Sequence, residues 1–362
     1  MSNKKLSTKA LHSGHDVALT QGTRAVPIYQ STSYVFNDSA HAANLFALSE
    51  PGYIYTRLNN PTNDILEKRL ADIEGGIGAV VTTSGASAIS TALLVLLKAG
   101  DHIVASNSLY GGTFNLLNVT LPRFGIKTTF VDPSDPINFN HAVQENTRAF
   151  FVESLGNPKL DVLDLKEISN YAKKSKVPLM VDNTVATPAL LNPIDYGANI
   201  VIHSLTKYIN GNGTVLGGAI IDAGTFDWSN GKFPEFTEPS PGYHGLVYHD
   251  ALGPAAFIAK ARIEGLRDLG GAISPFNSFQ IIQGIETLDI RMKKHSENAM
   301  FLANSFENDG IKTVYPGLKS HPSHKIFTEM INDEYGYGGM VTIDVGQLKK
   351  ANKLMEIMQE RN

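Results

Sequence analysis

The sequence predicts an α/β fold with a mostly parallel sheet covered by helices. The first observation is a series of short apolar segments that alternate with segments of helical periodicity. The second is length, because 362 residues exceed what one compact core usually holds. The third is a change of pattern near residues 61 and 285, which divides the chain into an arm (1–60), an α/β domain (61–284) and a smaller, incomplete α+β domain (285–362).

The composition is typical of a globular enzyme. A net charge of −4 leaves no basic surplus for a nucleic-acid partner. The chain has no cysteine, which excludes disulfides, thiolate metal sites and a cysteine nucleophile. The N-terminus lacks an apolar signal-peptide core, and the longest apolar run, 91–97, is too short for a membrane span. These features predict a cytoplasmic protein with no membrane, nucleic-acid or metal partner.

The arm, residues 1–60, shows little periodicity. It combines turn residues with scattered aromatic side chains, a composition typical of a segment that packs against another surface, often a partner subunit. The aromatic residues are Tyr29, Tyr34, Phe36, Tyr53 and Tyr55.

Regular elements begin after the arm. Leu66, Leu70 and Ile73 recur at helical spacing and stop at Gly75-Gly76, which indicates a helix C-terminus. Strands are then expected at 79–83, 103–106, 127–131, 149–153, 178–181 and 200–203, with helices at 85–98, 113–124 and 164–176.

Residues 223–253 interrupt this alternation. The segment is rich in proline, glycine and aromatic residues without a period, which favours an ordered loop insertion or a lid. Helices at 255–269 and 275–306, a strand at 340–345 and a last helix at 348–360 complete the expected elements.

Two residues follow the ends of neighbouring expected strands. Asp182 comes after segment 178–181, and Lys207 comes just after segment 200–203. Because ligands of parallel sheets bind at the carboxyl ends of strands, we expect both side chains to face one site. Pyridoxal phosphate (PLP) needs such a pair: a lysine that forms a Schiff base and a carboxylate that keeps the pyridine nitrogen protonated. Taken alone, the two residues would strongly favour the ordinary interpretation, a surface lysine and a turn aspartate.

A phosphate group also has candidate ligands. Ser84-Gly85-Ala86-Ser87 begins an expected helix, where small residues let backbone N–H groups approach an anion. Ser204 and Thr206 offer hydroxyl donors close to Lys207. An ordinary helix N-cap at Ser84 is the alternative.

Three more residues have side chains suited to such a ligand. Tyr110 follows an expected strand and has a ring that can stack on a planar group. Tyr55 and Arg57 lie in the arm, and arginine suits phosphate because its donors are paired and charged. Ordinary packing of the tyrosines and a solvated arginine are the alternatives.

Six segments, in order, resemble the Cys/Met metabolism family of fold-type-I PLP enzymes. The likeness extends from about Leu11 to the C-terminus. It implies Lys207 as the Schiff-base lysine, Asp182 as the partner of the pyridine nitrogen, Tyr110 as the stacking ring and Asn157 as the ligand of the phenolic oxygen. It implies a phosphate site made of Gly85, Ala86, Ser204 and Thr206, with Tyr55 and Arg57 reaching the neighbouring subunit of a homodimer or homotetramer. The segments are 55–62, 84–85, 109–113, 153–158, 181–184 and 203–208.

Within the family the chain most resembles the O-acetylhomoserine sulfhydrylase branch. Gly112 stands where methionine γ-lyases have cysteine, and segments 233–245, 274–277 and 283–288 are similar to that branch. The resemblance implies γ-replacement: Lys207 moves protons, acetate leaves the γ-carbon and sulfide adds to give homocysteine, with Tyr110 assisting near the γ-carbon. Methionine γ-lyase or cystathionine γ-synthase activity, another acyl group, and a catalytically impaired PLP-binding chain are alternatives.

The resemblance ends before the family's C-terminal segment. Family members continue for several dozen residues past the position of Asn362, and that segment holds an arginine that binds the substrate carboxylate. No arginine after Met340 matches it, since Arg361 stands at the end of the last expected helix. No carboxylate-binding arginine is therefore assigned.

Overall fold

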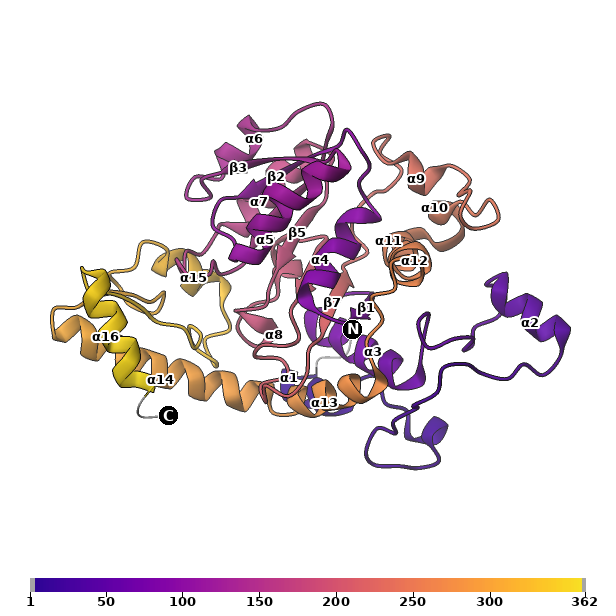
Figure 1. Ribbon diagram of the computed structural model, residues 1–362, viewed down its shortest axis with the longest axis horizontal. Coiled ribbons are helices and arrows are strands. Elements are labelled where there is room, and N and C mark those ends of the chain that lie inside the picture. Colours follow the sequence, from indigo (N-terminus) through magenta and orange to yellow (C-terminus); the bar gives the residue numbers. More distant parts are fainter. Residues whose placement is uncertain (1–3, 360–362) are drawn as a thin grey trace.

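The computed structural model describes residues 4–359, in which seven strands form one sheet of order β1-β7-β6-β5-β4-β2-β3 (Figure 1). Strands β2 to β6 run parallel to one another, whereas β7 is antiparallel to both β6 and β1. The expected mostly parallel sheet is confirmed. The strands are β1 Gly78–Thr82, β2 His102–Ser106, β3 Lys127–Val131, β4 Thr147–Glu153, β5 Leu179–Asp182, β6 Ile200–His203 and β7 Gly218–Asp222.

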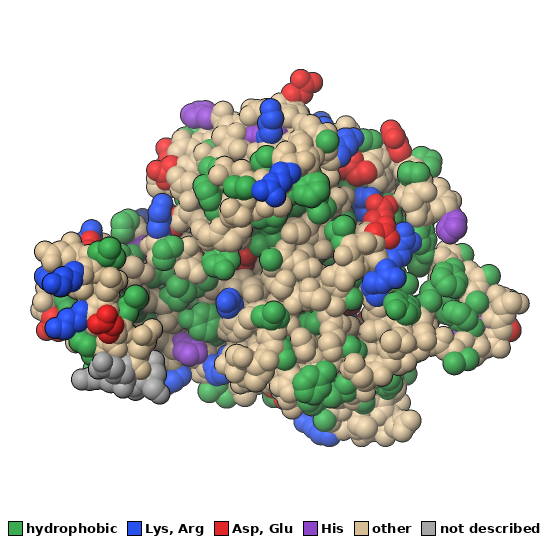
Figure 2. Space-filling view, viewed as in Figure 1, with side chains coloured by type: hydrophobic (Ala, Val, Ile, Leu, Met, Phe, Trp, Pro, Cys, Tyr) green, Lys and Arg blue, Asp and Glu red, His purple; other side chains and the backbone are tan. Residues whose placement is uncertain are grey.

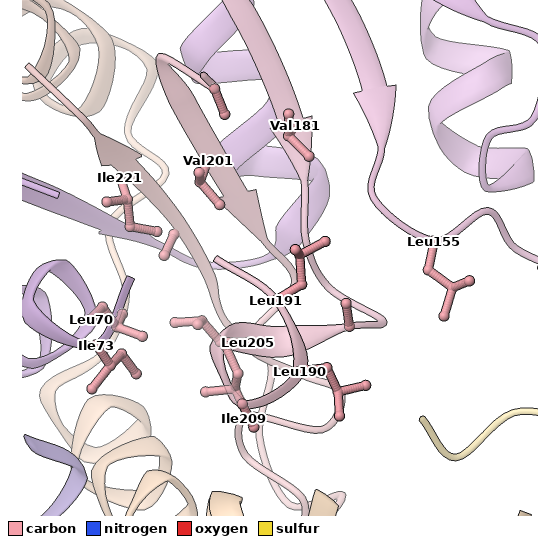
Figure 3. Packing of buried hydrophobic residues seen from close by; sticks show 14 of the residues in the cluster. Leu70, Ile73, Leu155, Val181, Leu190, Leu191, Val201, Leu205, Ile209 and Ile221 are labelled. Atoms are coloured by element: carbon pink, nitrogen blue, oxygen red, sulfur yellow. The ribbon is translucent and has the colours of Figure 1, made fainter. Parts of the chain in front are cut away.

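Helices cover both faces of the sheet. Successive strand residues point to opposite sides, and in these strands the side chains on both sides are buried. Val181 and Val201 belong to one hydrophobic cluster, to which Leu70 and Ile73 of one helix also contribute (Figure 3). The neighbouring strand residues Met180 and Ile200 belong to a second cluster. The first cluster includes residues of α3 Pro61–Glu74, α7 Leu165–Lys174, α8 Thr187–Leu190 and α13 Pro275–Ile285, and the second includes residues of α4 Gly85–Leu94 and α11 Ala256–Lys260.

Several expected helices are shorter or less regular than their periodicity indicated. The helix expected at 85–98 ends at Leu94. The one expected at 113–124 begins earlier, as α5 Gly111–Asn115, and continues through a π turn and a 3-10 turn to Gly125, which has a φ of 78°. A π turn also interrupts the helix expected at 255–269. The stretch 275–306 divides at Glu286–Thr287 into α13 and α14 Leu288–Asn308. Hydrophobic spacing tolerates such breaks, so it does not reveal them.

The arm contains short helices that its aperiodic sequence did not predict, α1 Leu6–His12 and α2 Ser39–Phe46. The part carrying α2 projects from the rest of the chain (Figure 1). Hydrophobic side chains are exposed on this projection (Figure 2), among them Val35, Phe46 and Leu48.

Residues 223–253 form an ordered insertion with short helices α9 Pro234–Thr237 and α10 Tyr248–Leu252. An aromatic cluster anchors it, because the Trp228 ring stacks on Phe236 at 4.4 Å and on Phe257 of α11 at 5.3 Å between centroids. These buried rings pack this part of the insertion against α11, as expected of an ordered insertion.

The C-terminal region packs against α14, which extends from the large domain to the far side of the molecule (Figure 1). It has elements of its own: β8 Lys312–Val314 paired antiparallel with β9 Thr342–Asp344, α15 His324–Met330 and α16 Leu348–Gln359. The expected strand 340–345 is thus three residues long, and Glu360 of the expected last helix lies outside the described residues, as does Arg361. Within residues 4–359, no helix is long and apolar enough to cross a membrane.

Candidate active site

A cavity of about 800 Å³ lies at the carboxyl ends of the parallel strands. Eight candidate residues from the sequence line it together, although the first and last of them, Gly85 and Lys207, are 122 positions apart in the chain. They are Gly85, Ala86, Tyr110, Asn157, Asp182, Ser204, Thr206 and Lys207. Tyr55 and Arg57 do not line this cavity.

Asp182 is the last residue of β5, and one of its carboxylate oxygens is held by Thr184. Its Oδ1 accepts the N–H and the hydroxyl of Thr184, at 3.0 and 2.5 Å. The Thr184 hydroxyl oxygen in turn accepts the N–H of Ser204 at 2.8 Å, which ties β5 to the segment after β6. Burial raises the pKa of Asp182, while the Thr184 hydrogen bonds lower it. The Oδ2 atom has no hydrogen-bond partner among the described residues and is free to bind a cationic ligand.

Glu153 is a second carboxylate that sequence reasoning did not assign to the site. It ends β4 directly beside Asp182, lines the cavity and accepts the N–H of Tyr110 at 2.6 Å. Burial and the neighbouring Asp182 raise its pKa well above the ordinary value. Its position at the end of a buried strand, like that of Asp182, was the signal that could have identified it.

The start of α4 has the features that an anion site requires. The Ser84 hydroxyl accepts the N–H of Ser87 at 3.1 Å, so it acts as the N-cap. The N–H groups of Gly85 and Ala86 have no partner within the described part of the chain and lie at the positive end of the helix dipole. Ser84 can therefore serve as the helix N-cap while the N–H groups of Gly85 and Ala86 remain available to an anion.

Glycine is required at position 85 because the segment after β6 approaches it closely. A Cβ atom there would lie 2.6 Å from the Cβ atom of Ser204 and 2.9 Å from its Cα atom. The close approach brings the Ser204 side chain to the helix N-terminus. Thr206 lines the same cavity, and its hydroxyl accepts the N–H of Gly217 at 3.1 Å.

Tyr110 and Lys207 face the cavity from different strand ends. The Tyr110 side chain is 56% exposed, which leaves a ring face available to a ligand. A Cβ atom at Gly112 would lie 2.6 Å from Cε1 of that ring, so the residue at 112 controls where the ring lies. Lys207 follows β6 in a turn, with its N–H donated to the carbonyl of Ser204 at 3.2 Å.

Tyr55 and Arg57 lie in the arm. Tyr55 is 42% exposed, and the Arg57 guanidinium lies 5.5 Å from the centroid of its ring. Arg57 also donates from Nη1 to the carbonyl of Arg267. Within one chain these two residues are therefore separate from the cavity.

The donors and acceptors around the cavity fit PLP. The α4 N-terminus and nearby hydroxyls would hold the phosphate, Asp182 the pyridine nitrogen, and Lys207 the aldehyde carbon. Two adjacent buried carboxylates without a cation are unfavourable by themselves, and a pyridinium ring would supply the missing positive charge. Asn157 also lines the cavity, as a ligand of the phenolic oxygen would have to.

Comparisons with known proteins agree with this fit. The family model for the Cys/Met metabolism PLP-dependent enzymes matches residues 7–360. The chain is 52% identical to an O-acetyl-L-homoserine sulfhydrylase of Leptospira meyeri, over 98% of this chain and 82% of that protein. It is 49% identical to a homocysteine synthase of Schizosaccharomyces pombe, over 92% and 79% of the two chains. A crystal structure of an O-acetylhomoserine (thiol)-lyase of Campylobacter jejuni, with N'-pyridoxyl-lysine-5'-monophosphate, matches with a TM-score of 0.94 and 39% identity, over 98% and 88% of the chains.

Proposed function

Because this chain belongs to the Cys/Met metabolism PLP-dependent enzyme family, we propose that it makes homocysteine and acetate from O-acetylhomoserine and sulfide. The reaction is a γ-replacement, in which the bond between Cγ and the acetyl oxygen breaks and a bond between Cγ and sulfur forms. The observation that supports it most directly is the cavity in which Asp182, Lys207 and the start of α4 lie together. The sulfhydrylase and homocysteine synthase names of its relatives support the same choice of substrates.

Bound in this cavity, PLP supplies an electron sink that stabilises negative charge on the substrate carbon. Lys207 is the base that takes the proton from Cα, because it is the amine that faces the cavity from the segment after β6. Asp182 holds the proton on the pyridine nitrogen through its free Oδ2. Tyr110 orients the ring by stacking and assists proton transfer near Cγ.

The phosphate is held by the N–H groups of Gly85 and Ala86 together with the hydroxyls of Ser204 and Thr206, and Asn157 binds the phenolic oxygen. Tyr55 and Arg57 complete the phosphate site of a neighbouring subunit, so the proposed enzyme is a homodimer or a homotetramer of dimers. Their exposure on the arm supports this part of the proposal. A cytoplasmic location likewise stays a prediction of the sequence.

A product assay tests the proposed reaction. The protein is incubated with PLP and O-acetylhomoserine, with and without sulfide, and homocysteine, acetate and 2-oxobutanoate are measured. Homocysteine formed only with sulfide is the expected result. Formation of 2-oxobutanoate and ammonia regardless of sulfide would favour a γ-lyase instead. If the wild-type protein forms no more product than the Lys207→Ala variant, the proposal is overturned.

A further inference from the structure

A buried polar network surrounds Asn183, the residue that follows Asp182. Glu74, the last residue of α3, accepts a hydrogen bond from Nδ2 of Asn183 at 2.9 Å. Nε2 of His203 lies 2.5 Å from the same Glu74 oxygen, Oε1. Nδ2 of Asn192 donates to the other oxygen at 3.1 Å. Glu74, Asn183 and His203 are at most 1% exposed, so this network has no solvent to replace a lost partner.

The network determines its own donors and acceptors. The hydroxyl of Ser154 donates to Oδ1 of Asn183 at 2.7 Å, and the Nδ2 atom of Asn183 donates also to the carbonyl of Leu191 at 2.9 Å. The amide orientation of Asn183 is therefore fixed, and Glu74 must accept. Because Glu74 accepts from two amides, Nε2 of His203 lies where it can donate to the same carboxylate.

This network contacts the backbone on which Asp182 stands. The N–H of Ser154 donates to the carbonyl of Asp182 at 3.0 Å, and the N–H of Asn183 donates to the carbonyl of Ile202 at 2.9 Å. The ends of β4, β5 and β6 are thus joined at the point where Asp182 enters the cavity. Nδ1 of His203 is buried without a partner among the described residues, an arrangement that costs stability.

The charges around Asp182 come from several elements. Glu153 on β4 and Lys207 after β6 line the same cavity, and His203 on β6 lowers the pKa of Asp182 when it is protonated. Glu74 on α3 lies behind His203 and is the only carboxylate within hydrogen-bonding distance of it in the described structure.

We propose that Glu74 is a positioning residue for the cofactor site, acting on Asp182 through His203 and Asn183. Glu74 orients the imidazole and the amide, and these hold the strand end so that Oδ2 of Asp182 meets the pyridine nitrogen. This proposal rests on the function proposed above, since it needs Asp182 as the partner of that nitrogen. Neither Glu74 nor His203 lines the cavity, so neither is a catalytic residue.

A purely structural role is the competing explanation, because the same network attaches α3 to the sheet. In that case a Glu74 variant would have a lower melting temperature, while its affinity for PLP and the titration of bound PLP would stay as in the wild type. Glu67 provides a matched control, because it is also a buried carboxylate of α3. It accepts the N–H of Val81 at 3.0 Å and pairs with Arg262, and neither partner belongs to the network around Glu74.

The experiment compares Glu74→Gln with Glu67→Gln in the full chain. Three quantities are measured without substrate: the melting temperature of the PLP-free protein, the dissociation constant of PLP, and the pH titration of the visible absorption of bound PLP. Glu74→Gln is expected to weaken PLP binding about tenfold and to shift the titration, because Asp182 loses its fixed position. With substrate, kcat falls about tenfold while KM stays within about twofold. Glu67→Gln is expected to lower only the melting temperature.

Two more variants keep the test decisive. His203→Gln retains a donor for Glu74 and is expected to bind PLP more tightly than His203→Leu. Ser154→Ala removes only one hydroxyl at the edge of the network, and it is expected to give a smaller shift of the same titration even where Glu74→Gln does not fold.

The outcomes separate this proposal from the function on which it rests. Wild-type titration and PLP affinity in Glu74→Gln, or in Ser154→Ala where the former does not fold, would overturn the positioning role alone. A wild-type protein that develops no visible absorption with PLP would overturn both proposals.

Discussion

Gly85→Ala is the substitution with the most direct geometric consequence. The added Cβ atom would lie 2.6 Å from Cβ, 2.9 Å from Cα and 3.0 Å from Oγ of Ser204. Carbon atoms normally approach to about 3.5–4.0 Å, so α4 and the segment after β6 must separate by roughly 1 Å. The Cα atom belongs to the backbone, and no side-chain rotation can relieve this contact.

The magnitude follows from two opposing effects. Overpacking in a close-packed interior costs about 1–3 kcal/mol. Replacing glycine by alanine stabilises by about 0.4–1 kcal/mol through the unfolded chain. The free energy of unfolding is therefore expected to fall by roughly 0–2.6 kcal/mol. Moving Ser204 away from the helix N-terminus also removes part of the phosphate site, so PLP affinity is expected to fall at least about tenfold, the equivalent of one hydrogen bond to a charged group.

The assay measures the melting of the PLP-free protein and a PLP titration for Gly85→Ala and for Gly111→Ala. Gly111 also begins a helix next to the cavity, but a Cβ atom there would meet nothing within 4 Å. Gly111→Ala is expected to melt no lower than the wild type. Unchanged PLP affinity in Gly85→Ala, with the expected loss of stability, would refute the placement of the phosphate at α4.

Lys207→Ala is expected to abolish both the reaction and the borohydride-dependent attachment of PLP to the protein, measured by mass spectrometry; attachment at another lysine would refute the role of Lys207. Arg57→Ala and Lys207→Ala are each expected to be inactive, and mixing the two after partial unfolding should restore roughly a quarter of the activity if each site takes residues from two chains; no recovery would favour sites made by one chain. Burial raises the pKa of Asp222 to about 7. Since the folded chain then binds this proton more tightly than the unfolded chain, stability falls as the pH rises from about 4 through 7. Asp222→Asn is expected to reduce that fall in melting temperature, and an unchanged pH dependence would contradict it.

The sheet was predictable from sequence because its strands are buried on both faces and therefore read as continuous apolar runs. The same property indicated where the cavity lies, because Asp182 directly follows one such run and Lys207 comes four residues after the end of the next. Ser204 and Thr206 could be predicted together with Lys207 because they stand close to it in the sequence.

What the sequence did not reveal depends on contacts between distant segments. Glu153 resembles any polar residue at a strand end until β4 and β5 are paired in register. Glu74 is 129 residues from His203 and looks like the exposed end of an amphipathic helix, yet it is fully buried. The short helices of the arm have too few residues for a period to emerge.

The electrostatics of the site give one reason why so many polar groups lie behind it. Glu153 and Asp182 are adjacent buried carboxylates, and the pKa of each is raised by burial, that of Glu153 also by its neighbour. A pyridinium ring beside Asp182 would remove this repulsion, so the site favours the cationic form of the ring that makes the better electron sink. Such a preference is useful only when Asp182 stays at one position, because Coulomb energies in a low-dielectric interior change steeply with distance. The network of Glu74, Asn183 and His203 supplies that constraint from behind the strand ends, where it leaves the cavity free for substrate.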